Sequence, residues 1–63
     1  NRHKNILKAV NNGINNLQDI TKFVYLGIPN INFTLANDQV LAHLKQLIKE
    51  EEIEKIDSQY YGH

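Results

Sequence analysis

The chain has 63 residues, in which seven lysines and arginines balance seven aspartates and glutamates, and it contains no cysteine. A length of this order permits one domain with a small core, and the missing cysteines exclude disulfides and thiolate zinc sites. The zero net charge argues against a dedicated, high-affinity DNA binder, because proteins that depend on phosphate contacts usually carry a basic surplus.

The sequence has no methionine at any position, including the first, which favours a piece of a longer protein. No apolar run is long enough to cross a membrane, and the start NRHKNILKAV is not typical of a secretory signal. We therefore expect an intracellular protein, in the cytoplasm or an organellar matrix, with no membrane partner.

Two short helices are expected in the first part of the chain. Asn1 is a suitable N-cap for the first helix, and the segment 11–13, with sequence NNG, tolerates the positive φ that ends it. Asn15 or Asn16 caps the second helix, which ends before the GIP sequence at 27–29. The apolar residues at helical spacing are Ile6, Leu7 and Val10 in the first helix and Leu17, Ile20, Phe23 and Val24 in the second.

A longer third helix begins between Ile31 and Asn37 and continues to Glu50. It then meets an acidic segment, residues 50–54, without any glycine or proline. Since such a junction usually needs a left-handed residue, either Glu51 adopts a positive φ with modest strain or the bend is made in another way. The expected apolar stripe of this helix consists of Leu35, Val40, Leu41, Leu44, Leu47 and Ile48.

After Glu50 the apolar pattern approaches a period of two, with Ile53 and Ile56 on either side of two charged residues. The segment 57–59, with sequence DSQ, is a candidate turn, and Tyr60 and Tyr61 suit a short returning strand. Three helices followed by a hairpin predict a winged helix-turn-helix. The expected fold class is therefore mainly α with a small β hairpin, as a single domain over residues 1–63.

The chemistry-bearing side chains are few and dispersed. His3, His43 and His63 show no ligand spacing such as i and i+4 on a helix, so we expect no metal or other cofactor in this segment. Ser58 stands in the candidate turn with no histidine nearby in sequence, which makes a nucleophile improbable. We expect no catalytic residue in this chain.

Lys45, Lys49 and Lys55 are the candidate contacts to nucleic acid, the first two on the exposed side of the third helix. The other cations available to a phosphate are on the first helix: Arg2, Lys4 and Lys8. Asn37 and Gln39 are candidates for reaching bases, although an ordinary solvated polar face has the same composition. The acidic segment that follows would repel the same phosphates. We therefore expect any binding to be weak, sensitive to salt and indifferent to sequence, with a single strand as the favoured ligand.

The stretch VYLGIPNINFTLANDQVLAHLKQLIKEEEI resembles the C-terminal winged-helix domain of metallo-β-lactamase-fold hydrolases of the lactamase-beta-like-2 and glyoxalase-II-like type. That domain has a Tyr at the end of its second helix, a Pro four residues on, then an Ala and a Leu-x-His-Leu-x-x-Leu segment. It also has a long link between helices two and three, and a Gly where this chain has Glu51. The matching residues are Tyr25, Pro29, Ala36, Leu41, His43, Leu44 and Leu47.

The resemblance implies that the segment is a C-terminal accessory domain and that catalysis takes place elsewhere in the protein. The N-terminal domain would bind two zinc ions through a His-x-His-x-Asp-His motif, which this chain lacks. The partners implied are that catalytic domain and, weakly, single-stranded RNA. The alternatives are a free-standing DNA-binding regulator, which rests on fold analogy, and a protein-interaction module.

Overall fold

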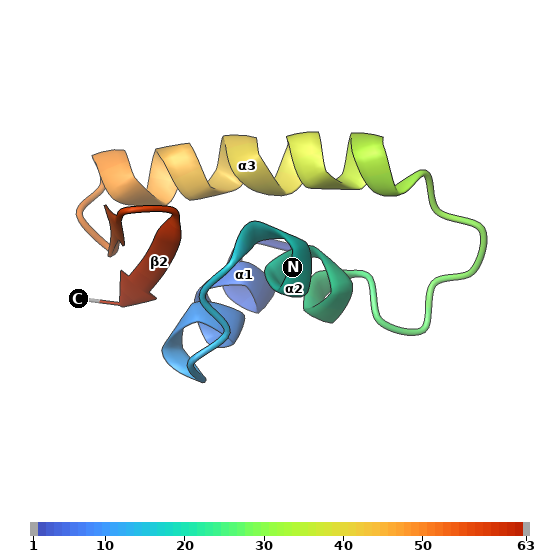
Figure 1. The fold of residues 1–63 in the computed structure, drawn as a ribbon, viewed down its shortest axis with the longest axis horizontal. Helices are drawn as coiled ribbons and strands as arrows, with labels where there is room; N and C mark the ends of the chain where they lie inside the picture. The colour runs from blue at the N-terminus through green and yellow to red at the C-terminus, as the bar shows by residue number, and fades with distance from the viewer. Residues whose placement is uncertain (1, 63) are drawn as a thin grey trace.

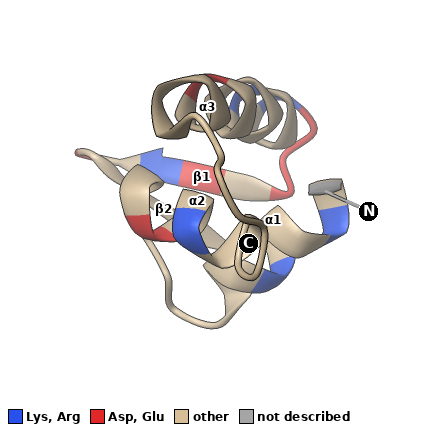
Figure 2. Ribbon diagram, turned by 90° about the vertical axis from the view of Figure 1, so that its right-hand side faces the viewer, with Lys and Arg blue, Asp and Glu red and all other residues tan. Residues whose placement is uncertain are grey.

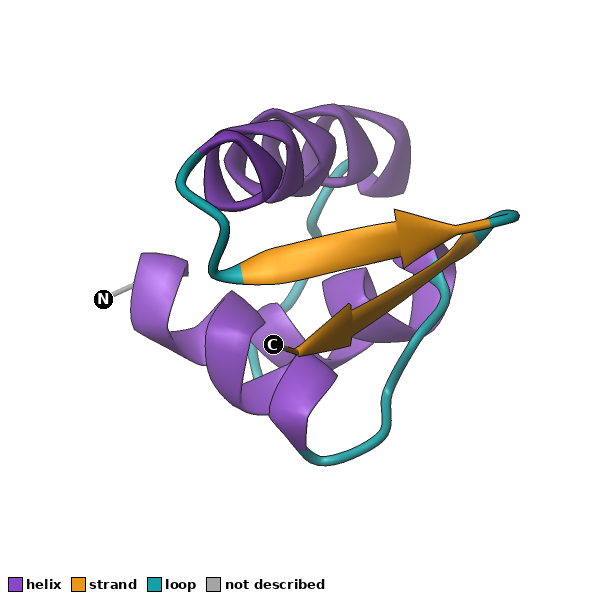
Figure 3. Ribbon diagram, turned by 90° about the vertical axis from the view of Figure 1, so that its left-hand side faces the viewer, coloured by secondary structure: helices purple, strands orange, loops and turns teal. Residues whose placement is uncertain are grey.

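The computed structural model describes residues 2–62, so the expected N-cap at Asn1 and the imidazole of His63 lie outside the described residues. The elements are α1 (Arg2–Asn11), α2 (Leu17–Val24), α3 (Phe33–Lys49), β1 (Ile53–Ile56) and β2 (Gln59–Gly62). α1 and α2 pack together beneath α3, which spans the length of the molecule (Figure 1). The hairpin β1–β2 turns back from the end of α3 and lies between α3 and α1 (Figure 3).

Asparagine side chains define where α2 and α3 begin. Asn16 Oδ1 accepts a hydrogen bond from the backbone N–H of Asp19 at 2.9 Å, so Asn16 is the cap of α2 rather than Asn15. Asn32 Oδ1 accepts in the same way from the N–H of Leu35 at 3.2 Å. These bonds satisfy N–H groups that the first turn of a helix leaves without intrahelical partners.

The end of α3 is a left-handed cap made without glycine. The N–H of Glu52 donates to the carbonyl of Leu47 at 2.9 Å, and the N–H of Glu51 donates to that of Ile48 at 3.0 Å. Glu51 has a φ of 62°. Of the two alternatives for this junction, the structure therefore has the left-handed residue rather than a bend made in another way. Gly13, with a φ of 85°, is the equivalent left-handed residue at the end of α1, two residues after the last helical residue as Glu51 is in α3.

The core lies where the three helices meet the hairpin. Thr21 is also fully buried there, and its hydroxyl donates to the carbonyl of Leu17 at 2.9 Å, which satisfies it within α2. Leu41 and Ile48 are half-buried at the edge of the core. The buried apolar members among the described residues are Ile6, Ala9, Val10, Ile20, Val40, Leu44, Leu47, Ile53 and Tyr60.

Leu35 is a correction to the predicted stripe, because its side chain is 58% exposed. At 100° per residue it lies about 140° around the helix from Val40, which points into the core. Ala36 takes the buried position in this turn of α3. Ala36 lines a pocket together with Tyr25 and Ile31, so this turn of α3 faces the end of α2 and the link that follows it.

The hairpin is antiparallel, with Ile53 opposite Gly62 and Ile56 opposite Gln59. The turn is therefore shorter than the predicted 57–59 segment, since Gln59 already belongs to β2. Tyr60 and Tyr61 form the returning strand, as predicted. The N–H of Tyr60 also donates to the carbonyl of Asn15 at 2.8 Å. The segment before α2 therefore lies beside β2, on the side away from β1. Three helices and this hairpin define a small, mainly α winged-helix domain.

Candidate nucleic-acid interface

The three lysines expected to contact nucleic acid lie on two surfaces. Lys45 and Lys49 are exposed on α3, one turn apart. Lys55 pairs with Tyr60 across the hairpin, and its Nζ lies 5.9 Å from the centroid of the Tyr60 ring. A cation at this distance is attracted to the ring. Because side chains alternate along a strand, Lys55 projects from the same side of β1 as the buried Ile53.

Acidic side chains surround these lysines. The exposed residues Glu50, Glu51 and Glu52 follow α3 directly, and Glu54 is the neighbour of Lys55 in β1 (Figure 2). Glu50 also accepts a hydrogen bond from Gln46 Nε2 at 2.9 Å. A phosphate brought to Lys49 or Lys55 would therefore meet nearby carboxylates, which weakens binding at this end of the molecule.

Of the two residues expected to reach bases, Gln39 is hydrogen-bonded within the domain and Asn37 is half-buried. Gln39 Oε1 accepts a hydrogen bond from the Tyr25 hydroxyl at 3.0 Å, across the link between α2 and α3. Asn37 is half-buried and its Oδ1 is buried, without a hydrogen-bond partner among the described residues. Base-edge readout needs amide groups that project freely from a helix. The exposed side of α3 therefore offers lysines but no free pair of amides at these positions.

The fold brings together two histidines that are far apart in the sequence. The rings of His3 in α1 and His43 in α3 are 6.0 Å apart in an edge-on arrangement. His3 Nε2 also lies 3.8 Å from Glu50 Oε1. Zinc needs its ligand atoms at about 2 Å, and within residues 2–62 no group of three His, Asp or Glu side chains is placed to hold a metal.

Charge is distributed unevenly over the molecule. Residues 1–31 contain four basic side chains and one acidic one, whereas residues 32–63 contain three basic and six acidic ones. The formal charges of the two halves are thus +3 and −3, and they cancel only in the total. In Figure 2 the basic segments of α1 lie below the hairpin, while the acidic segments gather on β1 and at the end of α3.

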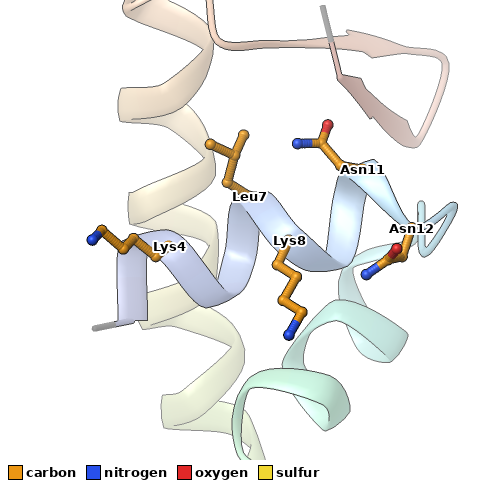
Figure 4. A pocket seen from close by; sticks show the side chains of 5 residues that line it. All are labelled: Lys4, Leu7, Lys8, Asn11 and Asn12. Atoms are coloured by element: carbon orange, nitrogen blue, oxygen red, sulfur yellow. The ribbon is translucent and has the colours of Figure 1, made fainter.

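A surface pocket on α1 was not predicted from the sequence. It has a volume of about 400 Å³ and is lined by Lys4, Leu7, Lys8, Asn11 and Asn12 (Figure 4). Leu7 is half-buried and the other four side chains are exposed. Lys4 and Lys8 are two of the first-helix cations noted in the sequence, and their i, i+4 spacing places them on one side of α1.

A second pocket, of about 330 Å³, lies where the α2–α3 link meets α3. Tyr25, Ile31 and Leu35 are among the residues that line it. Leu26 and Ile28, in the same link, are 81% and 49% exposed. No charged residue occurs between Lys22 and Asp38, so this end of the molecule presents apolar and uncharged polar groups only.

Comparison with protein-family models, curated proteins and solved structures finds no match to this chain. Within residues 2–62, no helix has the length and apolar character needed to span a bilayer.

Proposed function

We propose that this chain is an accessory winged-helix domain of a metallo-β-lactamase-fold hydrolase, packed beside the catalytic domain and aiding access of substrate to it. The observation that carries the proposal is the hydrogen bond from the Tyr25 hydroxyl to Gln39. It ties the end of α2 to α3 across the link 25–32, where an ordinary DNA-reading helix-turn-helix has a tight turn. Tyr25 and this long link are both features of the resemblance.

The other matching residues have structural roles consistent with the proposal. Ala36, Leu44 and Leu47 are buried, and His43 lies against His3 of α1. The main departure from the family pattern is Glu51, where the family has a Gly. The φ of 62° at Glu51 is a conformation that glycine adopts at little cost, so the backbone is compatible with the family pattern.

The surface best suited to the catalytic domain is the apolar end of the molecule. Leu26, Ile28 and Leu35 are large apolar side chains that the domain leaves exposed. The centres of protein interfaces are depleted of charged residues, and the stretch from Phe23 to Asn37 has none. We therefore place the domain contact here rather than on the acidic end of α3.

The first test is the coding sequence upstream of Asn1. A His-x-His-x-Asp-His motif there supports the proposal, and a complete upstream sequence without one overturns it. The second test is hydrogen exchange of the backbone N–H groups of Leu26 and Ile28. They should exchange more slowly in the whole protein than in the 63-residue chain, whereas Asp57 and Ser58 in the hairpin turn should not change. Equal exchange at Leu26 and Ile28 would place the domain contact elsewhere.

A further inference from the structure

We propose that Asn12 is a site of spontaneous deamidation, and that the modification opens the end of α1 and loosens the hairpin. Of the nine asparagines in the chain, Asn12 alone precedes a glycine. A glycine after asparagine favours this reaction, because no side chain hinders its backbone nitrogen from approaching the asparagine side chain. The inference rests on Asn12 and Gly13 and does not depend on the proposed function.

The reaction needs only water and the two residues themselves. The backbone nitrogen of Gly13 attacks Cγ of Asn12, the new C–N bond replaces the bond to the side-chain nitrogen, and ammonia leaves with the proton of the Gly13 N–H. Water then opens the resulting succinimide. Addition of water at Cγ gives aspartate, whereas addition at the backbone carbonyl carbon of Asn12 gives isoaspartate, in which the chain continues through the side chain.

The structure leaves the reacting groups accessible. Asn12 and Gly13 are both exposed in the turn after α1, and no atom of the described residues lies within 4 Å of the position that a Cβ would take at Gly13. In Figure 4 the Asn12 side chain projects away from the hairpin, and it forms no hydrogen bond with another of residues 2–62. The neighbouring Asn11 differs, because its side chain lies against Gly62 of β2.

The other described asparagines are less suited to the reaction. Asn5 and Asn30 are exposed, but each precedes an isoleucine, whose branched side chain hinders the approach of the backbone nitrogen. Asn37 is half-buried within α3. The asparagines whose side chains are held in hydrogen bonds are Asn15, Asn16 and Asn32.

Backbone hydrogen bonds at the end of α1 oppose the reaction while the turn is closed. The N–H of Gly13 donates to the carbonyl of Val10 at 3.1 Å, and the N–H of Ile14 donates to that of Ala9 at 3.0 Å. The Gly13 nitrogen attacks only when this last turn opens, and helix ends open at a low cost in free energy. The rate of deamidation therefore follows the opening of α1.

Isoaspartate at position 12 prevents the turn from closing in the same way. Its backbone is one carbon longer, so the N–H groups of Gly13 and Ile14 no longer meet the carbonyls of α1. The link from here to α2 includes Asn15, which holds Tyr60 of β2 through two hydrogen bonds. The hairpin consequently loses part of its attachment to the start of α2.

The test follows the purified 63-residue chain during incubation at mildly alkaline pH, by ammonia release and by mass spectrometry of its peptides. We expect the mass increase of deamidation on the peptide that contains Asn12. Asn12→Gln should lose most of the ammonia release, because the larger ring that glutamine would form closes far more slowly. Asn5→Gln is the matched control, since Asn5 is an exposed asparagine of α1, and it should release ammonia as fast as the unaltered chain. Deamidation that falls first on another asparagine, or that Asn12→Gln does not slow, would overturn the site.

Hydrogen exchange then measures the effect on the hairpin. The Tyr60 N–H should exchange faster in the isoaspartate form, separated by chromatography, than in Asn12→Asp, which adds the same charge with an ordinary backbone. Equal exchange in these two forms would mean that the modification leaves the hairpin in place, and would overturn the structural half of the proposal.

Discussion

Asn15 and Tyr60 exchange two hydrogen bonds although they are 45 residues apart in the sequence. The Tyr60 N–H donates to the Asn15 carbonyl at 2.8 Å, and Asn15 Nδ2 donates to the Tyr60 carbonyl at 2.6 Å. An isolated two-stranded hairpin is marginally stable in water. The pair therefore joins the hairpin to the start of α2 and fixes its orientation.

Asn15→Ala removes the side-chain half of this pair and leaves a partly buried carbonyl without a partner. We expect the free energy of unfolding to fall by about 1–3 kcal/mol, measured by urea titration. Gln18→Ala is the control, since Gln18 is exposed on α2, and it should change stability by less than about 0.5 kcal/mol. Equal stability of the Asn15 variant and the unaltered chain would show that the hairpin is held without this bond.

Leu44→Ala should lower stability by about 2–5 kcal/mol, because Leu44 is fully buried in the centre of the core. A domain this small has little stability to lose, so much of the variant should be unfolded at room temperature. Leu35→Ala is the matched control on the same helix, and it should melt close to the unaltered chain because Leu35 is 58% exposed. Similar melting curves for the two variants would contradict this description of α3.

Glu51→Gly should raise stability by about 1 kcal/mol, since it relieves the positive φ and removes a carboxylate from the C-terminus of α3. Glu52→Gly removes a neighbouring carboxylate, but Glu52 is not among the residues with a positive φ. That control should gain nothing, because the freedom that glycine adds to the unfolded chain offsets the loss of the carboxylate. Thermal unfolding distinguishes the two, and a loss of stability in the Glu51 variant would mean that the strain at this cap is negligible.

Burial raises the pKa of the Tyr60 phenol above its ordinary value of 10.0. The folded state then retains this proton more tightly than the unfolded chain, so the contribution of Tyr60 to stability is complete below the unfolded pKa. It is lost as the pH rises through the folded pKa, which predicts a fall in melting temperature above about pH 10. Tyr60→Phe should show a smaller fall than Tyr61→Phe, which keeps Tyr60. Identical pH profiles for the two variants would show that Tyr60 does not govern this loss.

The purified 63-residue chain should contain no stoichiometric zinc, and a chelator should leave its melting temperature unchanged. His3 and His43 lie side by side, but no third ligand completes a site among the described residues. Elemental analysis measures the zinc content, and thermal unfolding with and without a chelator measures the melting temperature. A chelator-sensitive metal would show that His3, His43 and Glu50 rearrange to bind one.

Sequence reasoning is sufficient where a structure depends on nearby residues. The start of α3 within the predicted range and the strand with Tyr60 and Tyr61 follow this pattern. At the cap of α2 and at the junction after α3 the sequence left two alternatives open, and the structure has Asn16 and a positive φ at Glu51. Each of them is fixed by a hydrogen bond to a neighbour in sequence or by a local side-chain period. The spacing of Leu44 and Leu47 likewise placed both in the core.

Only the tertiary structure decided which surfaces these elements present. Leu35 shares the apolar character of the predicted stripe, yet its angular position on α3 turns it to solvent, whereas Thr21 is buried despite its hydroxyl. The pairing of Asn15 with Tyr60 depends on the docking of the hairpin, which no local pattern encodes. The opposite charges of the two halves can be counted in the sequence, but only the packing brings Glu50, at the end of α3, to 3.8 Å from His3 in α1.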